Sequence, residues 1–86
     1  MIIERLNIPD VLVCSPQVFE DERGYFFESF RADQLRSVLG FDIQFVQDNE
    51  SKSNKGVLRG FHYQLPPFSQ TKLVRVIKGA ILDVVV

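Results

Sequence analysis

Residues 56–64, Gly-Val-Leu-Arg-Gly-Phe-His-Tyr-Gln, have the composition of a β-strand and contain the only histidine of this 86-residue chain. The stretch contains Val57, Phe61 and Tyr63, residue types that are typical of a strand in a sheet. Alternation along a regular strand places Arg59 and His62 on opposite faces. If both residues serve one site, we expect a bulge or a strong twist at Gly60, which lies between them.

Short apolar stretches of the same kind recur along the whole chain. We expect strands at Ile2–Leu6, Val11–Cys14, Tyr25–Phe30, Ile43–Asn49, Val57–Leu65, Lys72–Lys78 and Ala80–Val86. Many short strands at this spacing indicate an all-β domain built as an antiparallel sandwich or barrel.

One helix is expected at Arg31–Leu39, because Leu35, Val38 and Leu39 fall on one helical face and Gly40 is a suitable C-terminal stop. Glycine, proline and small polar residues mark the other breaks between elements. We expect turns at Asp21–Gly24 and Ser51–Gly56, a break at Pro66-Pro67 and a tight turn or bulge at Gly79.

The composition is that of a soluble globular protein, with 45% hydrophobic and 24% charged residues. A chain of this length forms one domain at most. The single cysteine, Cys14, excludes an internal disulfide and fits a reducing compartment. No apolar run is long enough to span a bilayer and no secretory signal is visible at the N-terminus, so we expect a cytoplasmic protein without a membrane partner.

The last residues, Ile81–Val86, stop in the middle of a strongly strand-forming run. An uncapped apolar strand is an unusual end for a domain, because its free edge invites aggregation. We expect the chain to be the N-terminal piece of a longer domain; the alternative is a strand that completes an oligomer.

Charge is unevenly distributed, although the formal net charge is only −1. Residues 1–50 carry ten acidic and four basic side chains, whereas residues 51–82 carry six basic side chains and no acidic one. The basic segment indicates an anionic ligand or an acidic partner surface. Alternatively, these basic side chains form ion pairs with the acidic first half of the chain.

Three ionisable residues of the second half are candidates for chemistry. His62 can act as a base near a bound anion, since the ordinary pKa of histidine is about 6.5, or it can be a hydrogen-bonded core residue. Lys72 begins an otherwise apolar strand, where its ammonium either points at a cavity mouth or reaches solvent from the strand end. Asp83 lies among Ile, Leu and Val and therefore needs a partner if it is buried.

Polar and aromatic residues also indicate a small-molecule site. Gln47 and Asn49 end one predicted strand, and Arg23 and Glu28 flank the aromatic run Tyr25–Phe27. Rings of this kind stack on nucleobases, and polar side chains bind base or sugar edges. Two adjacent phenylalanines of a strand cannot both face inward, so one of Phe26 and Phe27 should be exposed or covered by a partner. One histidine and one cysteine, far apart, make a metal site unfavourable.

Four ordered motifs together resemble the dTDP-4-dehydrorhamnose 3,5-epimerase family, over essentially the whole chain. They are residues 21–30 (DERGYFFESF), 45–49 (FVQDN), 56–64 (GVLRGFHYQ) and 72–76 (KLVRV). The resemblance implies the N-terminal portion of a cupin-type jelly roll or β-barrel, which works as a homodimer with strand exchange and without metal or other cofactor. It also implies an isomerase that inverts C3 and C5 of dTDP-4-dehydro-6-deoxy-D-glucose during dTDP-L-rhamnose biosynthesis, with no nucleic acid as partner.

The resemblance assigns roles to individual residues. His62 is implied as the general base that removes the protons α to the C4 ketone, and Lys72 as the group that stabilises the enolate oxygen. The residues implied in substrate binding are Arg23, Phe26, Glu28, Gln47, Asn49, Arg59 and Asp83, with the first three acting across the dimer interface. The basic segment then faces the diphosphate of the substrate.

Length is the main departure from this family, whose members are about twice as long as this chain. The general-acid tyrosine and the carboxylate that orients the histidine belong to the second half of the family domain. We therefore expect residues 1–86 to be a partial cupin-like domain that is inactive by itself. The alternatives are a non-catalytic fragment that binds nucleotide-sugar or pairs with another cupin half, and a metal-dependent cupin isomerase.

Overall fold

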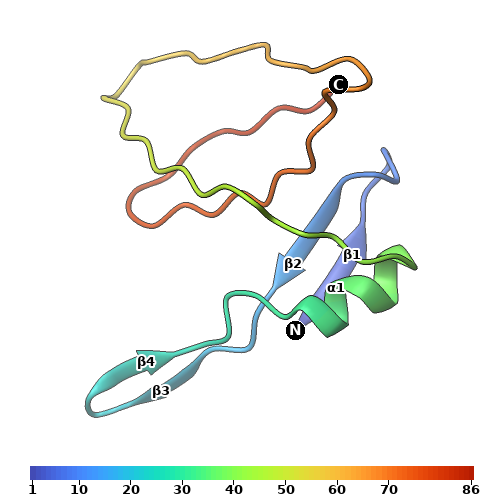
Figure 1. The fold of residues 1–86 in the computed structure, drawn as a ribbon. Coiled ribbons are helices and arrows are strands. Elements are labelled where there is room, and N and C mark those ends of the chain that lie inside the picture. The colour runs from blue at the N-terminus through green and yellow to red at the C-terminus, as the bar shows by residue number, and fades with distance from the viewer. The chain divides into compact units, whose positions relative to one another are not determined.

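Two antiparallel hairpins and one helix make up the regular structure of the chain. The computed structural model describes all residues from Met1 to Val86. The elements in order are β1 (Ile2–Arg5), β2 (Leu12–Ser15), β3 (Phe19–Asp21), β4 (Gly24–Phe26) and α1 (Ala32–Leu39) (Figure 1). The chain divides into two units, Met1–Ile43 with Val84–Val86, and Gln44–Asp83, and every regular element belongs to the first unit.

The first hairpin pairs β1 with β2 in a register that places Ile3 opposite Cys14. Side chains of a strand alternate between the two faces of the sheet. Accordingly Ile3, Leu12 and Cys14 are half-buried, whereas Val13 between them is exposed. The predicted strands Ile2–Leu6 and Val11–Cys14 are thus confirmed to within one residue at their ends.

The second hairpin pairs β3 with β4 and places Phe19 opposite Phe26. A two-residue loop joins the strands, and Gly24 after the loop has φ of 135°, a conformation that residues with a Cβ rarely adopt. The predicted turn at Asp21–Gly24 is confirmed. The predicted strand Tyr25–Phe30 is shorter in the structure, since β4 ends at Phe26, and β3 was not predicted.

Helix α1 follows the sequence pattern closely. Its half-buried residues include Leu35, Val38 and Leu39, the three predicted to share a face. Gly40 ends the helix in the left-handed conformation, with φ of 81°, and its N–H donates to the carbonyl of Arg36 at 2.7 Å. The predicted helix and its stop are confirmed, with the first predicted residue serving as the N-cap.

A side-chain contact ties the helix to the first hairpin. The Arg5 guanidinium donates to the carbonyl of Val38 at 2.7 Å and to the carbonyl of Pro9 at 2.8 Å. The carbonyls near the C-terminus of a helix have no partner within the helix. Arg5 therefore satisfies one of these groups and holds the end of α1 beside strand β1.

Residues 44–83 form no helix or strand (yellow-green to red in Figure 1). The predicted strands Ile43–Asn49, Val57–Leu65, Lys72–Lys78 and Ala80–Val86 are therefore wrong for this structure. A strand is held by the ladder to a neighbouring strand and by burial of one face, and these segments have neither. Their alternating pattern indicates strand propensity, but no neighbouring strand pairs with them.

The turns of this segment do match the sequence signals. The N–H of Val57 donates to the carbonyl of Asn54 at 3.2 Å, which closes the turn within Ser51–Gly56. The N–H of Phe68 donates to the carbonyl of Leu65 at 2.8 Å across Pro66-Pro67. The chain also bends at Gly79, where φ is 88°. Local turn chemistry is therefore present without the strands that it was expected to connect.

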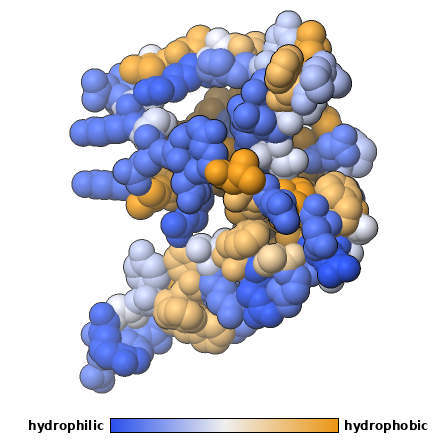
Figure 2. Space-filling model, viewed as in Figure 1, coloured by the Kyte–Doolittle hydropathy of each residue, from blue (hydrophilic) through white to orange (hydrophobic).

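No residue of the chain is fully buried. Large apolar side chains are exposed throughout, with Phe61 at 73% and Leu58 at 90% exposure. Figure 2 shows such hydrophobic residues beside long hydrophilic side chains on the visible face. The regular structure is of the all-β class with one short helix, and no helix has the length and apolar character needed to cross a membrane.

Candidate functional site

The loop of the second hairpin is held by an ion pair between Asp21 and Arg23. The Asp21 carboxylate accepts the backbone N–H of Arg23 at 2.8 Å, and the Arg23 Nη2 lies 2.6 Å from Asp21 Oδ2. An aspartate that bonds to the backbone two residues later stabilises a turn. The Arg23 side chain, followed by its backbone N–H, holds the pKa of Asp21 below its ordinary value, and Asp21 raises the pKa of Arg23.

An open hollow of about 530 Å³ lies on the same hairpin. Its lining combines aromatic rings with charged groups: Phe19, Glu20, Asp21, Arg23, Gly24, Tyr25 and Phe26. Two of these residues, Arg23 and Phe26, are among those that the sequence implicated in binding. The lining thus combines aromatic rings, on which a planar ligand can stack, with one arginine that is paired with Asp21.

The aromatic side chains of β4 and of the next residue, Phe27, differ in their surroundings. Tyr25 and Phe27 stack, with ring centroids 5.9 Å apart and planes inclined by 13°. Phe27 is half-buried, while Phe26 is 65% exposed. The expectation that only one of Phe26 and Phe27 turns inward is confirmed, and the exposed ring is Phe26.

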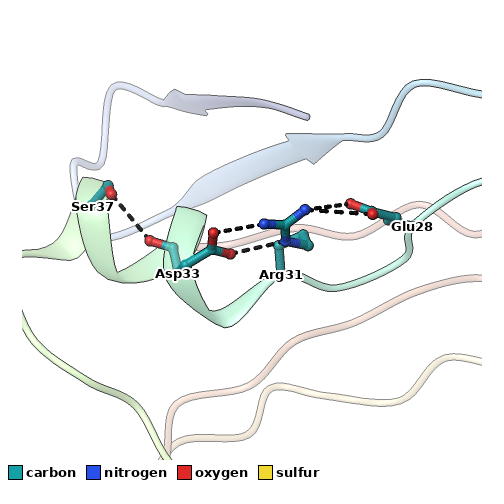
Figure 3. Close-up of polar contacts among 4 residues, drawn as sticks. All are labelled: Glu28, Arg31, Asp33 and Ser37. Carbon is teal, nitrogen blue, oxygen red and sulfur yellow. Dashed lines mark hydrogen bonds and ion pairs between the residues drawn. The ribbon is translucent and has the colours of Figure 1, made fainter.

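A second charged cluster lies where the hairpin strand leads into helix α1 (Figure 3). Arg31 donates from Nε and Nη2 to the two oxygens of Asp33 at 2.9 and 2.7 Å, and its Nη1 lies 3.2 Å from Glu28 Oε2. Contact with Asp33, and then with Glu28, raises the pKa of Arg31. Arg31 in turn holds the pKa of Asp33 below its ordinary value.

Three hydrogen bonds involve predicted site residues of the second unit. The Gln47 amide Nε2 donates to Asn49 Oδ1 at 3.2 Å, so these two predicted binding residues lie together. The Arg59 guanidinium donates to Ser53 Oγ at 2.7 Å and to the carbonyl of Lys52 at 3.0 Å. Arg59 is therefore held against the loop before it and not against another predicted site residue.

The three chemistry-bearing residues of the second unit, His62, Lys72 and Asp83, are all exposed. No hydrogen bond or ion pair joins His62 to Arg59, Lys72 or Asp83. Because Asp83 is in water, it has no need of the partner that burial would have required. Gly60 has φ of 143°, but with no strand through it the predicted bulge has no ladder to interrupt.

The structure thus brings together some of the predicted site residues and not others. It joins Gln47 to Asn49 and places Arg23 and Phe26 at one hollow, whereas Glu28 contacts a residue that the sequence patterns did not single out, Arg31. The signal for Arg31 was present, since acidic residues stand three positions before it and two after it. No group of three or more His, Cys, Asp and Glu side chains comes together in a way that could hold a metal ion.

A family model described as dTDP-4-dehydrorhamnose 3,5-epimerase matches residues 5–86. The chain belongs to the dTDP-4-dehydrorhamnose 3,5-epimerase family. The curated dTDP-4-dehydrorhamnose 3,5-epimerase of Shigella flexneri is 54% identical over 86 residues, which is 100% of this chain and 48% of the relative. The one of Escherichia coli (strain K12) is 49% identical over the same length, 46% of that protein.

A less similar member of the dTDP-4-dehydrorhamnose 3,5-epimerase family also matches nearly the whole chain. The curated protein of that name from Methanothermobacter thermautotrophicus is 46% identical over 82 residues, which is 95% of this chain and 43% of the relative. The chain thus spans about half the length of these curated relatives. No solved structure matches the chain significantly.

Proposed function

We propose that this chain supplies the base-carrying and nucleotide-binding part of a dTDP-4-dehydrorhamnose 3,5-epimerase. The observation that carries the proposal is the family match over residues 5–86, which includes all four motifs quoted above. The reaction is the conversion of dTDP-4-dehydro-6-deoxy-D-glucose to dTDP-4-dehydro-L-rhamnose, by removal of the protons α to the C4 ketone. Its place is the cytoplasmic synthesis of dTDP-L-rhamnose for O-antigen and other cell-wall polysaccharides.

His62 is the proposed base and Lys72 the proposed electrophile. The protons at C3 and C5 are acidified by the C4 ketone, so their removal needs an imidazole within reach of the sugar and a cation at the oxygen where charge develops. The chain contains no other histidine, and Lys72 is the first residue of the fourth motif, residues 72–76. The other basic residues of 51–82 supply charge for the diphosphate.

The binding residues fall into two proposed groups. The hairpin and the segment after β4 hold the nucleoside through Arg23, Phe26 and Glu28, consistent with the hollow there, which is lined by aromatic rings and Arg23. Gln47, Asn49 and Arg59 hold the sugar and diphosphate, with Asp83 as a charge or hydrogen-bond partner nearby. The contact between Gln47 and Asn49 supports their assignment to one subsite.

We also propose that residues 1–86 act as part of one cupin-like jelly roll within a homodimer that exchanges strands. The segments that carry His62 and Lys72 have strand composition and exposed apolar side chains, and a jelly roll would supply the neighbours that they lack. Pairing would bury these side chains and fix the base and the lysine relative to each other.

The 86-residue chain by itself is expected not to turn over. Electrostatic stabilisation of an enolate works when the donors are fixed and water is excluded, and His62 and Lys72 are both exposed here. The same exposure favours the second candidate, a chain that binds nucleotide-sugar or pairs with another cupin half without catalysing a reaction.

The test compares the chain with a chimera in which the remaining half of the Shigella flexneri relative follows Val86. Each protein is incubated with dTDP-4-dehydro-6-deoxy-D-glucose in D2O, and deuterium at C3 and C5 is followed by NMR. The proposal expects double exchange and epimerisation by the chimera and neither by the chain alone. A folded chimera without exchange would favour the non-catalytic candidate, and full turnover by the 86-residue chain would refute its dependence on further structure.

A further inference from the structure

Arg31 occupies the junction between two carboxylates, one on the strand side and one on the helix side (Figure 3). Its Nε and Nη2 form a two-point contact with Asp33, at 2.9 and 2.7 Å, and its Nη1 contacts both Glu28 oxygens at 3.2 and 3.4 Å. A planar guanidinium that is held at two points has a fixed orientation, because its donors form a rigid fork. Asp33 therefore fixes the plane of Arg31, and Arg31 fixes the direction of Glu28.

Asp33 is itself anchored to the helix. It stands in the first turn of α1, where a negative charge is favourable, and its backbone carbonyl accepts the Ser37 hydroxyl at 3.0 Å. All these contacts are local, within four residues of each other in sequence. The resulting connection runs from the helix through Asp33 and Arg31 to Glu28.

The Glu28 carboxylate keeps capacity for a ligand. An ionised carboxylate offers about four acceptor positions on two oxygens, and only one guanidinium nitrogen, Arg31 Nη1, contacts Glu28. The Glu28 side chain is 51% exposed, so a ligand can reach it. A neutral or mobile neighbour in place of Arg31 would leave this carboxylate free to rotate.

We propose that Arg31 is a positioning residue for nucleotide binding, which holds Glu28 in the orientation that accepts a hydrogen bond from the nucleoside part of the substrate. This role rests on the proposed function, in which Glu28 binds the nucleotide. Arg31 acts through Glu28 and does not bind the diphosphate, because the two carboxylates that flank its guanidinium leave the cluster with a net charge of −1.

The test measures binding of dTDP, thymidine and inorganic pyrophosphate by NMR titration to the chimera described above, which supplies the rest of the proposed domain. Arg31→Ala is expected to weaken dTDP and thymidine binding by the same factor, about threefold to tenfold, and to leave pyrophosphate binding unchanged. Arg31→Lys, which keeps the charge and loses the fork, should recover only part of the loss. Arg36→Ala is the matched control, since Arg36 lies on the same helix and pairs with Asp42 instead.

A double-mutant cycle separates positioning from a purely structural role. In the Glu28→Gln background, Arg31→Ala should cause no further loss of dTDP affinity, whereas a structural defect would add to the loss. Circular dichroism of each variant reports whether α1 is retained. If the unmodified chimera binds dTDP and its Arg31→Ala variant binds dTDP equally well, or if the two losses add, only the role of Arg31 is refuted. If the folded, unmodified chimera binds neither dTDP nor thymidine, the proposed nucleotide-binding function of the hairpin is refuted as well.

Discussion

Residues 1–43 and residues 44–83 differ in whether their strand-forming segments are paired. The first region is built from hairpins and one helix, whose partners are near in sequence, as with Ile3 opposite Cys14. The second region has equally good strand composition and forms no ladder. Local pairs cost little loop-closure entropy, whereas distant pairs must recover a larger cost through packing. We therefore expect the region with the proposed base and lysine to need strand partners that the structure does not contain.

The largest expected effect is on the chemistry of the second region. Replacing His62 by Ala in the chimera should lower deuterium exchange at C3 and C5 by about 10²–10⁴-fold, because a positioned general base contributes that much. Tyr63→Phe is the matched control in the same segment and should exchange at the parent rate. NMR of the substrate in D2O measures both. If the His62 variant still exchanges deuterium at the parent rate, His62 is not the base.

The next largest effect is on amide hydrogen exchange, which should differ between the two regions. In the 86-residue chain, amides of 57–65 and 72–78 should exchange with solvent almost freely, while those of β1, β2 and α1 are slower. In the chimera, pairing of the same segments should slow their exchange by about a hundredfold or more. Hydrogen exchange read by mass spectrometry checks this. Equal exchange in both proteins would mean that the added half does not supply the missing strands.

The contrast also explains which parts of the fold the sequence could predict. The turn Asp21–Gly24 and the helix stop at Gly40 were predictable because the residues that create them are adjacent in sequence. Strand β3 was missed because Phe19 is its only apolar residue and its partner, β4, gives it its conformation. Strands at Val57–Leu65 and Lys72–Lys78 were predicted from propensity, which does not identify a partner.

The candidate site was predictable to a similar extent. Residue chemistry and motif order led to the proposal of His62, Lys72 and the hairpin residues, and these assignments stay predictions. Contacts such as Arg31 with Glu28 depend on the φ and ψ of the residues between them, which no pattern specified. For the same reason the sequence did not indicate that Arg59 would bond to Ser53.

A smaller effect is expected from the helix stop in the first region. Gly40 has φ of 81°, where a Cβ is unfavourable although no atom lies close enough to clash with it. Gly40→Ala should therefore destabilise α1 by about 1–2 kcal/mol through backbone strain alone. Gly79→Ala, with φ of 88° but no adjoining helix, is the control and should leave the helix signal in circular dichroism unchanged. An unchanged helix in Gly40→Ala would show that the end of α1 is held by Arg5 instead.

The smallest effect is the response of the first region to acid. The pKa values of Asp21 and Asp33 lie below their ordinary value because Arg23 and Arg31 bond to the ionised forms. A lowered folded-state pKa gives a contribution that is complete above the ordinary value, about 3.9, and is lost as the pH falls through the folded value. Helicity and hairpin chemical shifts should thus be constant from about pH 7 to about pH 4 and decline below that, because the carboxylates become neutral. Asp33→Asn should abolish the helix part of this response and keep the hairpin part. Since both pairs are accessible to solvent, added salt should weaken this response. A response that is insensitive to salt and to Asp33→Asn would assign it to other carboxylates.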